Sequence, residues 1–400
     1  MTRALLSLNA GSSSIKFALF VVDGGGEPLH VAGGKIEGIG TAPHLAAKDD
    51  NGEHVVERRW PDGEGLTHED LLGELIGWLG NHLDGRELLA VGHRVVHGGT
   101  EFVGPVRVDD GVLARLDALC PLAPLHQPHN LAAIRAMTDL LPQVPQIACF
   151  DTAFHHAMPP LATRLALPRA LHDEGIRRYG FHGLSYDYVS RRLRQIDPAL
   201  ADGRVIAAHL GNGASMCAMA GGASVDTTMG FTALDGLVMG TRSGSLDPGA
   251  VLHLIERKGM SAAETEAMLY QQSGLLGVSG ISSDMRVLRQ SGRPEAEEAI
   301  ALFAWRAVRE AGGLMSSLGG LDGLVFTAGI GENDADMRAR ICAGLAWAGV
   351  ALDQAANEAN APIISSAASA VKVFVIPTDE ERMIAMQALS TLGIGTEGTA

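Results

Sequence analysis

Two segments of the chain share one design, in which an apolar strand, a tip of glycine and serine and a second strand follow one another. The first segment covers Arg3–Phe20 and the second covers Arg204–Ala220. Gly11 and Gly211 hold matching places in the two tips. The match favours two similar halves, one per domain, although a strand, a glycine and a strand also follow one another by chance.

Length and composition describe an ordinary globular chain of 400 residues, 46% hydrophobic and 19% charged. At roughly 150 residues per domain this length predicts two domains, with three as the alternative. The net charge of −15 argues against a broad surface for nucleic acid or anionic membrane. Four scattered cysteines without a C-x-x-C pair indicate free thiols in a reducing compartment. No stretch is apolar for long enough to be a signal peptide or membrane span, so we expect a cytoplasmic protein.

Apolar patterning predicts strands and helices in alternation, which is typical of α/β layering. The expected strands cover residues 3–8, 15–20, 88–97, 147–154, 205–209, 324–327 and 371–376. The expected helices cover residues 68–82, 130–141, 184–195 and 294–318, another from about 334, and a last one to about 392 with Thr378 as its cap. Residues 22–66 are expected to form short strands and loops, and residues 393–400 a frayed tail.

The two hairpin tips are candidate phosphate sites, because backbone N–H groups at such turns can bind an anion. In the first tip, Ser12 and Ser14 add hydroxyl donors, Lys16 adds a charge, and Asn9 could hold a metal-bound water. The second tip is Gly211-Asn212-Gly213 after a buried strand. Both tips are also compatible with ordinary hairpin turns. No Walker P-loop sequence is present.

A third glycine-containing turn, Phe326–Asn333, could pass close to a flat ring such as adenine, although an ordinary strand-to-helix loop would look the same. Arg94 and Arg242 both lie beside glycines, where an arginine can grip carboxylate or phosphate with two hydrogen bonds. For one arginine a structural ion pair is the commoner role. His182 lies between glycines before a helix, where a structural role is again the commoner one.

Two carboxylates complete the set of candidate groups. Asp151 ends an apolar strand, which is a costly place for a carboxylate unless it is paired or functional. Glu380 lies at a helix start, where acids are stabilising in any case.

Taken together, a series of ordered stretches resembles the acetokinase family, which comprises acetate kinase and its short-chain acyl kinase relatives. The stretches are N-A-G-S-S-S-I-K-F, G-H-R-V-V-H-G-G, A-P-L-H, F-D-T-A-F-H, R-R-Y-G-F-H-G, H-L-G-N-G-A-S, D-T-T-M-G-F-T, G-L-V-M-G-T-R-S-G, S-G-L-L-G-V-S-G, S-S-D-M-R, F-T-A-G-I-G-E-N and P-T-D-E-E. The resemblance implies two ribonuclease H-like domains of the actin/Hsp70/sugar-kinase type with the active site in the interdomain cleft. Chain order predicts domain I at 1–150 plus 382–400 and domain II at 151–381.

The resemblance also implies a reaction, its cofactor and its residues. The γ-phosphoryl group of ATP would move reversibly to acetate, giving acetyl phosphate and ADP, with Mg²⁺, or Mn²⁺ as an alternative, in a homodimer. Asn9 and Glu380 would hold the metal, and Asp151, His182 and Arg242 would be catalytic. Arg94 would grip the substrate carboxylate, in a pocket lined by Val96, Leu125 and Phe181. The nucleotide would contact Lys16, His209, Leu210, Gly211, Asn212, Gly213, Asp284, Met285, Arg286, Gly329, Ile330, Gly331, Glu332 and Asn333.

The role of Asp151 follows from the acidity of the substrate. The family gives this residue an acid/base role, but a small carboxylic acid, with a pKa near about 4.3, is already ionised at pH 7. We therefore expect Asp151 to act through the metal or by orienting Arg94 or Arg242.

The sequence departs from the family pattern at two places. Relatives commonly read G-F-H-G-T-S-H, where this chain has Leu184-Ser185-Tyr186, and M-G-F-T-P, where it has Ala233. Ala233 could leave room for a longer acyl chain. A kinase that prefers propionate or butyrate is therefore the first alternative. A non-kinase ATPase of the actin/Hsp70 group is the second.

Overall fold

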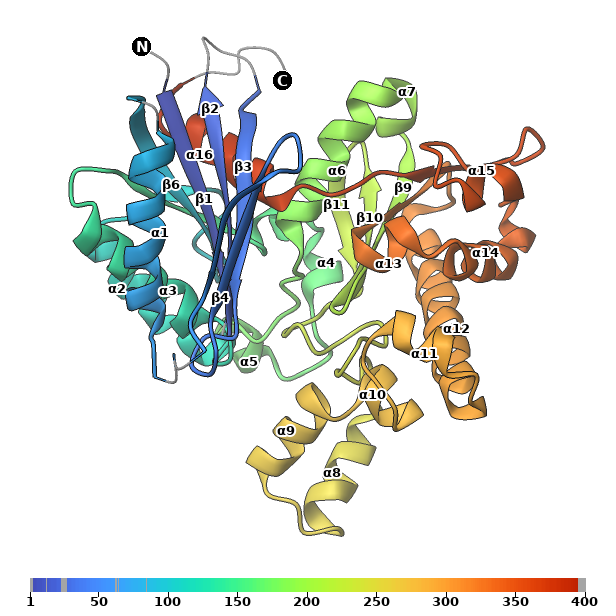
Figure 1. Cartoon of the computed structure of the whole chain (residues 1–400). Coiled ribbons are helices and arrows are strands. Elements are labelled where there is room, and N and C mark those ends of the chain that lie inside the picture. Colours follow the sequence, from blue (N-terminus) through green and yellow to red (C-terminus); the bar gives the residue numbers. More distant parts are fainter. Residues whose placement is uncertain are drawn as a thin grey trace. The chain divides into compact units, whose positions relative to one another are not determined.

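The computed structural model describes residues 3–11, 13–22, 27–61, 63, 65–83 and 85–394 (Figure 1). Its internal contacts divide the chain into two compact units, Met1–Phe154 with Asp379–Ala400, and His155–Thr378. The boundaries predicted from chain order lie at 150/151 and 381/382. Asp151 and Glu380 therefore belong to the first unit here. Within the described residues, no helix is both long enough and apolar enough to cross a membrane.

The first unit is built on one sheet with the strand order β5-β4-β3-β2-β1-β6-β8-β7. Its strands are β1 (Arg3–Ala10), β2 (Ser14–Val22), β3 (Leu29–Glu37), β4 (His44–Asp49), β5 (His54–Arg59), β6 (Glu87–Val95), β7 (Val106–Arg107) and β8 (Gln146–Phe150). Its helices are α1 (His68–His82), α2 (Asp110–Ala118), a 3₁₀ turn at Cys120–Leu122, α3 (Gln127–Leu140) and α16 (Glu380–Thr391).

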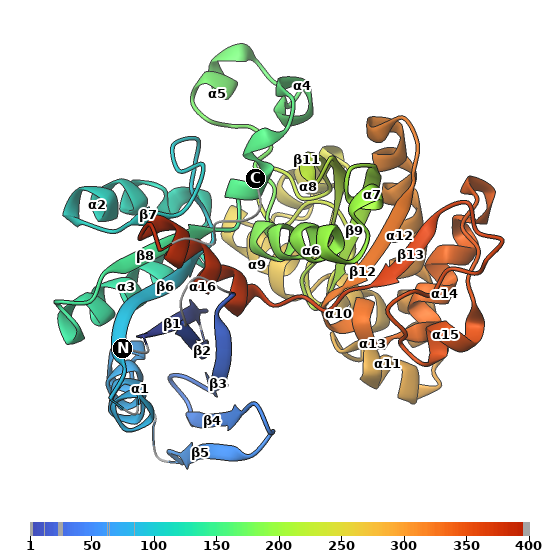
Figure 2. The same ribbon diagram turned by 90° about the horizontal axis from the view of Figure 1, so that it is seen from above.

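The central strand of this sheet is buried on both faces. Successive side chains of a strand point to opposite faces, and Leu6 and Leu8 of β1 join one core cluster with the apolar residues of α1 and α3. Helix α16 packs against β1, β6 and β8, as Figure 2 shows. A Cβ at Gly92 would lie 2.5 Å from Cγ2 of Ile384, so only glycine lets α16 approach β6 this closely.

The second unit has a sheet with the order β11-β10-β9-β12-β13. Its strands are β9 (Arg204–Leu210), β10 (Ala214–Ala220), β11 (Ala223–Thr227), β12 (Gly323–Thr327) and β13 (Lys372–Val375). Its helices are α4 (Pro160–Thr163), α5 (Arg169–Asp173), α6 (Gly183–Ile196), α7 (Pro198–Ala201), α8 (Pro248–Glu256), α9 (Ala262–Gln271), α10 (Gly274–Ser279), α11 (Met285–Ser291), α12 (Pro294–Leu318), α13 (Ala328–Asn333), α14 (Ala335–Gly344) and α15 (Gln354–Glu358), with a 3₁₀ turn at Ala346–Ala348. A further 3₁₀ turn, Ala153–Ala157, spans the boundary in the chain at which the second unit begins.

The two sheets share one topology over five strands. In each sheet a hairpin continues into a third antiparallel strand, and two parallel strands lie on the other side of the first strand. Strands β6 and β8 are these parallel strands in the first unit, and β12 and β13 are their counterparts in the second. The expectation of an α/β chain with two similar domains is confirmed.

The strands expected within residues 22–66 are β3, β4 and β5, which extend the first sheet and are joined by turns. Two local predictions differ from the structure. Gly329–Gly331 lies within the short helix α13, which begins at Ala328 with a φ of 63°. The cap of α16 is Asp379, whose side chain accepts from the Arg382 N–H, whereas the Thr378 hydroxyl bonds to Ser185 instead.

Candidate active site

In the first unit, three polar side chains lie where adjacent parallel strands end. Asn9 is near the end of β1, Arg94 is near the end of β6, and Asp151 follows β8. Arg94 donates from Nε to Oδ2 of Asp151 at 2.9 Å and from a terminal nitrogen to Oδ1 of Asn9 at 3.1 Å. The carboxyl ends of parallel strands are the usual ligand sites of α/β sheets. The sequence therefore places an arginine with a fixed orientation at such an edge.

The charges around Arg94 are closely coupled. Burial alone would lower the pKa of Arg94, but the nearby carboxylates of Asp151 and Glu380 raise it above its ordinary value. Arg94 is therefore a permanent cation whose side chain is 21% exposed, whereas that of Asp151 is 1% exposed. Burial raises the pKa of Glu380 to about 7, with Arg94 opposing the shift and Asp151 adding to it. A cation beside Glu380 would favour its ionised form.

The oxygen atoms of this cluster fit a small divalent cation. Oδ1 of Asp151 is buried and has no hydrogen-bond partner in the structure. With the Glu380 carboxylate and the Asn9 amide it offers hard oxygen donors of the kind that Mg²⁺ prefers. No group of three or more His, Cys, Asp or Glu side chains is arranged for a metal in the described part of the chain. The protein would thus supply only part of the metal's ligands, as is usual for Mg²⁺ bound with phosphates.

The other predicted groups of this unit lie on β2 and near the ends of β6 and α3. Lys16 is exposed on β2 and lines a groove of about 1050 Å³ together with Asp379 and Glu381. Ser14 starts β2, its carbonyl accepting from the Gly11 N–H at 2.8 Å, whereas Ser12 lies outside the described residues. Val96 is buried and Leu125 is 38% exposed.

Asn130 of α3 is a structural residue that the sequence analysis did not identify. Its Oδ1 accepts from the N–H of Val96 at 3.0 Å, and its Nδ2 donates to the carbonyl of Ala10 at 2.6 Å. It therefore ties the ends of β1 and β6 together, next to Asn9 and Arg94. A buried amide with both groups satisfied holds its partners in one geometry.

Buried neutral histidines make the folded state sensitive to acid. Burial lowers the pKa of His93 to about 4, which the hydrogen bond to Gln146 only partly opposes, and burial lowers those of His97 and His155 to about 4 as well. Below pH 6.5 the unfolded chain takes up protons that the folded chain does not, so stability is lost as pH falls towards 4. Each histidine can contribute roughly 3 kcal/mol to this loss.

We expect the urea concentration at the midpoint of unfolding to be lower at pH 4.5 than at pH 7. The variant His93→Gln should show a smaller decrease. His54→Gln, on the exposed surface of β5, is the matched control and should follow the wild type. An equal pH dependence of wild type and His93→Gln would contradict the assignment.

In the second unit, the loop before α6 holds His182 in an unusual backbone conformation. His182 has a φ of 59°, which is rare for a residue with a side chain. Nε2–H of His155 donates to the carbonyl of Phe181 at 2.9 Å, and Nδ1 of His155 accepts from the Ser224 hydroxyl at 2.9 Å. The preceding Gly180 has a φ of 79°, and a Cβ there would lie 2.6 Å from the His155 ring. Phe181, which is buried, and His182 are thus fixed by their neighbours.

His182 lies over the second hairpin tip. Its ring stacks on that of His209 with centroids 4.1 Å apart. A Cβ at Gly213 would lie 3.3 Å from Nε2 of His182. His209 and Leu210 are buried in β9, whereas Asn212 is exposed at the tip. The structure therefore brings His182 together with the predicted phosphate loop.

Arg242 lies on a loop that packs against this tip. A terminal nitrogen of Arg242 donates to the carbonyl of Ala233 at 3.0 Å. The N–H of Gly240 donates to the carbonyl of Asn212 at 2.8 Å, and a Cβ at Gly240 would lie 1.8 Å from Oδ1 of Asn212. Only glycine allows this approach, so the position of Arg242 is coupled to that of the tip.

Gly274 and Gly280 provide a matched test of this loop. Both have a φ of 62° at the ends of α10, but a Cβ at Gly274 would meet the carbonyl oxygen of Met239 at 2.2 Å, whereas Gly280 has open space. Gly280→Ala should cost roughly 1–2 kcal/mol of stability from its left-handed backbone alone and keep its activity. Gly274→Ala should cost more and displace Arg242, lowering kcat at least tenfold. Equal kcat values for the two purified variants would contradict this expectation.

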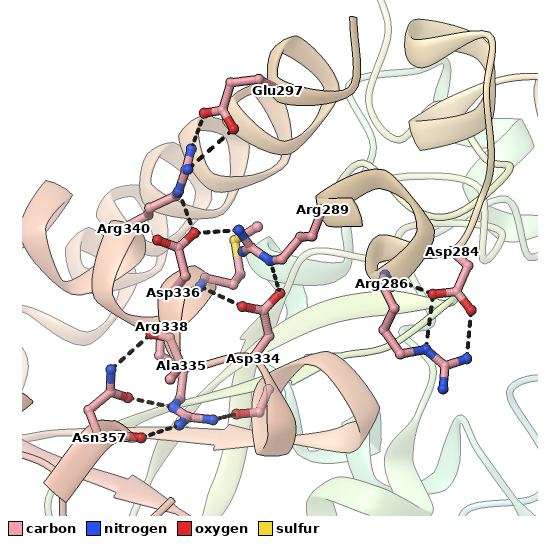
Figure 3. Close-up of polar contacts among 12 residues, drawn as sticks. Asp284, Arg286, Arg289, Glu297, Asp334, Ala335, Asp336, Arg338, Arg340 and Asn357 are labelled. Atoms are coloured by element: carbon pink, nitrogen blue, oxygen red, sulfur yellow. Dashed lines mark hydrogen bonds and ion pairs between the residues drawn. The ribbon is translucent and has the colours of Figure 1, made fainter. Parts of the chain in front are cut away.

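A pocket of about 780 Å³ in the second unit collects many of the predicted nucleotide residues. Its volume is typical of small-molecule sites. Of the predicted set it is lined by Gly211, Asn212, Asp284, Met285, Arg286, Gly329, Ile330 and Asn333. Figure 3 shows two ion-paired arginines of its wall, with Arg286 on Asp284 and Arg289 on Asp334.

The remaining predicted nucleotide residues of the α13 turn have structural contacts. Gly331 is buried, and the Glu332 carboxylate accepts from the N–H groups of Ala328 and Thr378 at 2.7 and 3.1 Å. Arg338, which the sequence analysis did not single out, is fully buried and donates to the carbonyls of Gly331 and Glu332 at 2.9 and 2.8 Å. These bonds satisfy the end of a short helix and hold the pocket wall in place.

Comparison with known proteins agrees with the motifs. The chain matches the model of the Acetokinase family over residues 4–386. It is 54% identical to the acetate kinase of Rhodopseudomonas palustris over 389 residues, which are 96% of this chain and 97% of that protein. Among solved structures, a propionate kinase from Francisella tularensis has a TM-score of 0.90 and 39% identity, covering 96% of this chain and 98% of its own. The acetate kinase of Porphyromonas gingivalis has a TM-score of 0.86 and 38% identity, covering 98% and 100%. The chain therefore belongs to the acetokinase family.

Proposed function

We propose that the protein is a phosphotransferase that moves the γ-phosphoryl group of ATP reversibly to acetate, giving acetyl phosphate and ADP. One observation supports this reading over an ATP-driven binding protein of the actin/Hsp70 group. Arg94 is a permanent cation, held by Asp151 and Asn9 at the ends of parallel strands. A pure ATPase has no need of a second anion site of this kind. Arg94 can grip the acetate carboxylate with two parallel hydrogen bonds.

The catalysis that we propose is positioning plus positive charge. Phosphoryl transfer asks for little covalent help from the protein. Arg94 orients the carboxylate, and the pocket of the second unit holds the nucleotide. Arg242 and His182 stabilise the charge on the moving phosphoryl group. Mg²⁺, bound through Asn9, Glu380 and the unpaired oxygen of Asp151, would neutralise phosphate charge. Asp151 fixes Arg94 and takes no proton, since acetate is already ionised.

The preferred acid is proposed from the relatives that the chain resembles. The acetate kinase of R. palustris is 54% identical to this chain, and the F. tularensis propionate kinase is 39% identical, so we propose acetate as the preferred substrate. The Ala233 carbonyl accepts from Arg242, and its side chain is smaller than the proline of the family pattern, so we propose that propionate is also accepted.

We expect hydroxylamine trapping to give acyl hydroxamate from acetate and, more slowly, from propionate, with ATP and Mg²⁺ present. Ala233→Pro keeps the carbonyl and should raise the ratio of acetate to propionate rates, within the roughly 10–200-fold that one methylene can give. Formate and butyrate complete the panel. ATP hydrolysis without formation of hydroxamate from any of these acids would contradict the kinase proposal.

We also propose a cytoplasmic homodimer. Helix α8 has the apolar sequence PGAVLHLIE, yet none of its residues is buried. Leu252 and Ile255 on α8 are 55% and 37% exposed, and Trp305 on α12 is 59% exposed. An apolar helix such as α8 whose side chains stay exposed is typical of a protein interface. Light scattering should give twice the chain mass for the wild type and a lower mass for Leu252→Asp.

A further inference from the structure

Each of the two stacked histidines in the second unit has a serine hydroxyl at Nδ1. Ser215 lies 2.8 Å from Nδ1 of His182, and Ser185 lies 2.8 Å from Nδ1 of His209. Each serine also contacts a second hydroxyl, which is that of Tyr186 for Ser215, at 2.5 Å, and that of Thr378 for Ser185, at 2.8 Å. The tautomer of a histidine is set by the hydrogen bond at its other nitrogen.

The direction of the chain from Tyr186 through Ser215 to His182 follows from acidity. A phenol, with a pKa of about 10, is a stronger acid than an alkyl hydroxyl, and imidazole is the strongest base of the three groups. The favoured order is therefore that Tyr186 donates to Ser215 and Ser215 donates to Nδ1 of His182. A neutral imidazole that accepts at Nδ1 carries its proton on Nε2.

Nε2 of His182 is the nitrogen on the side of the phosphate loop. A Cβ at Gly213 would lie 3.3 Å from it. We propose that Tyr186 is a positioning residue, which acts through Ser215 to hold His182 with its proton on Nε2, ready to donate to an oxygen of the transferred phosphoryl group. This inference rests on the role proposed above for His182.

A purely structural role for Tyr186 is the alternative. Tyr186 is fully buried, with its ring edge-on to those of His155 and His209 at 5.6 and 6.4 Å. Buried tyrosine hydroxyls usually find a partner of some kind. The partner here is Ser215, which also contacts Nδ1 of His182. The Tyr186 hydroxyl is therefore placed to orient the His182 ring through Ser215.

The test removes only that hydroxyl. Tyr186→Phe keeps the ring packing, and we expect the loss of this one hydrogen bond to lower kcat about tenfold. The KM values for ATP and acetate should stay within about twofold, because the bond acts on the transition state. Tyr188→Phe removes a hydroxyl two residues along the same helix and is the matched control, with kcat unchanged.

The tautomer itself is read by long-range ¹H–¹⁵N spectra of the histidine rings, with His182 assigned by its loss in His182→Gln. The wild type should show Nε2 protonated, and Tyr186→Phe should show a larger share of the Nδ1–H form. Ser215→Ala should lower kcat at least as much, and the double variant should be no slower than Ser215→Ala, because both act through one chain.

Several results would overturn the proposal. They are an unchanged kcat and tautomer in Tyr186→Phe, a change in KM or melting temperature alone, or additive losses in the double variant. If Tyr186→Phe does not fold, an unchanged His182 tautomer in Ser215→Ala has the same force. Failure of the proposed function would look different, since the wild type would form no acyl phosphate or His182→Gln would keep full activity. In either case, the tautomer spectra show whether Tyr186 sets the tautomer of His182.

Discussion

Replacing Arg242 by alanine should lower kcat by about 10³–10⁵-fold, the range known for an arginine that stabilises a transferring phosphoryl group. That range corresponds to about 4–7 kcal/mol of transition-state stabilisation. The KM for ATP should change little, because Arg242 does not line the pocket that collects the predicted nucleotide residues. Steady-state kinetics in the direction of acetyl phosphate formation measure both parameters.

The control for Arg242 is Arg169→Ala, an exposed arginine at the start of α5 in the same unit. It should leave kcat unchanged and so exclude a general effect of lost positive charge. Added guanidinium ion should restore part of the activity of Arg242→Ala but not of Gly274→Ala, where the loop itself is displaced. A kcat for Arg242→Ala within threefold of the wild type would remove this residue from the mechanism.

Asp151→Asn should lower kcat by about 10²–10³-fold and raise the Mg²⁺ concentration needed for half-maximal activity by about 10–100-fold. The substitution keeps an oxygen for Arg94 but removes the charge that balances it. It also places an amide where the unpaired carboxylate oxygen now lies. The lower kcat and the higher Mg²⁺ requirement are both expected because Asp151 orients Arg94 and contacts the metal. Neither effect requires Asp151 to transfer a proton.

Asp139→Asn, on the exposed surface of α3, is the matched control and should behave as the wild type. Thermal melting must accompany the kinetics, because removing one partner of a buried ion pair can cost about 3–5 kcal/mol of stability. If Asp151→Asn folds and keeps both full activity and unchanged metal dependence, neither role proposed for Asp151 holds.

The sequence predicted what depends on local pattern. The two hairpins, the bounds of α1 and α12, and the α/β layering follow from apolar periodicity and glycine placement. The grouping of Asn9, Arg94 and Asp151 is a consequence of strand order, since the ends of adjacent parallel strands meet at one edge.

The remaining features depend on contacts between distant residues. In the sequence, Arg338 is not distinguished from the exposed arginines of other helices. Its burial depends on hydrogen bonds to the carbonyls of α13 and to Asn357. Thr378 is a good helix cap in sequence but bonds to Ser185, 193 positions away. The link from Tyr186 to Ser215 joins a helix to a strand, which no local pattern predicts. The departure of Tyr186 from the family motif was the only signal that could have pointed to it.

The central claim is that the phosphoryl group passes to the carboxylate and not to water. Phosphorus-31 NMR of the purified protein with ATP, Mg²⁺ and acetate tests it most directly. We predict that the acetyl phosphate resonance appears together with that of ADP, and that added ADP and acetyl phosphate regenerate ATP. ADP accompanied only by inorganic phosphate, at a rate that acetate does not change, would contradict the account.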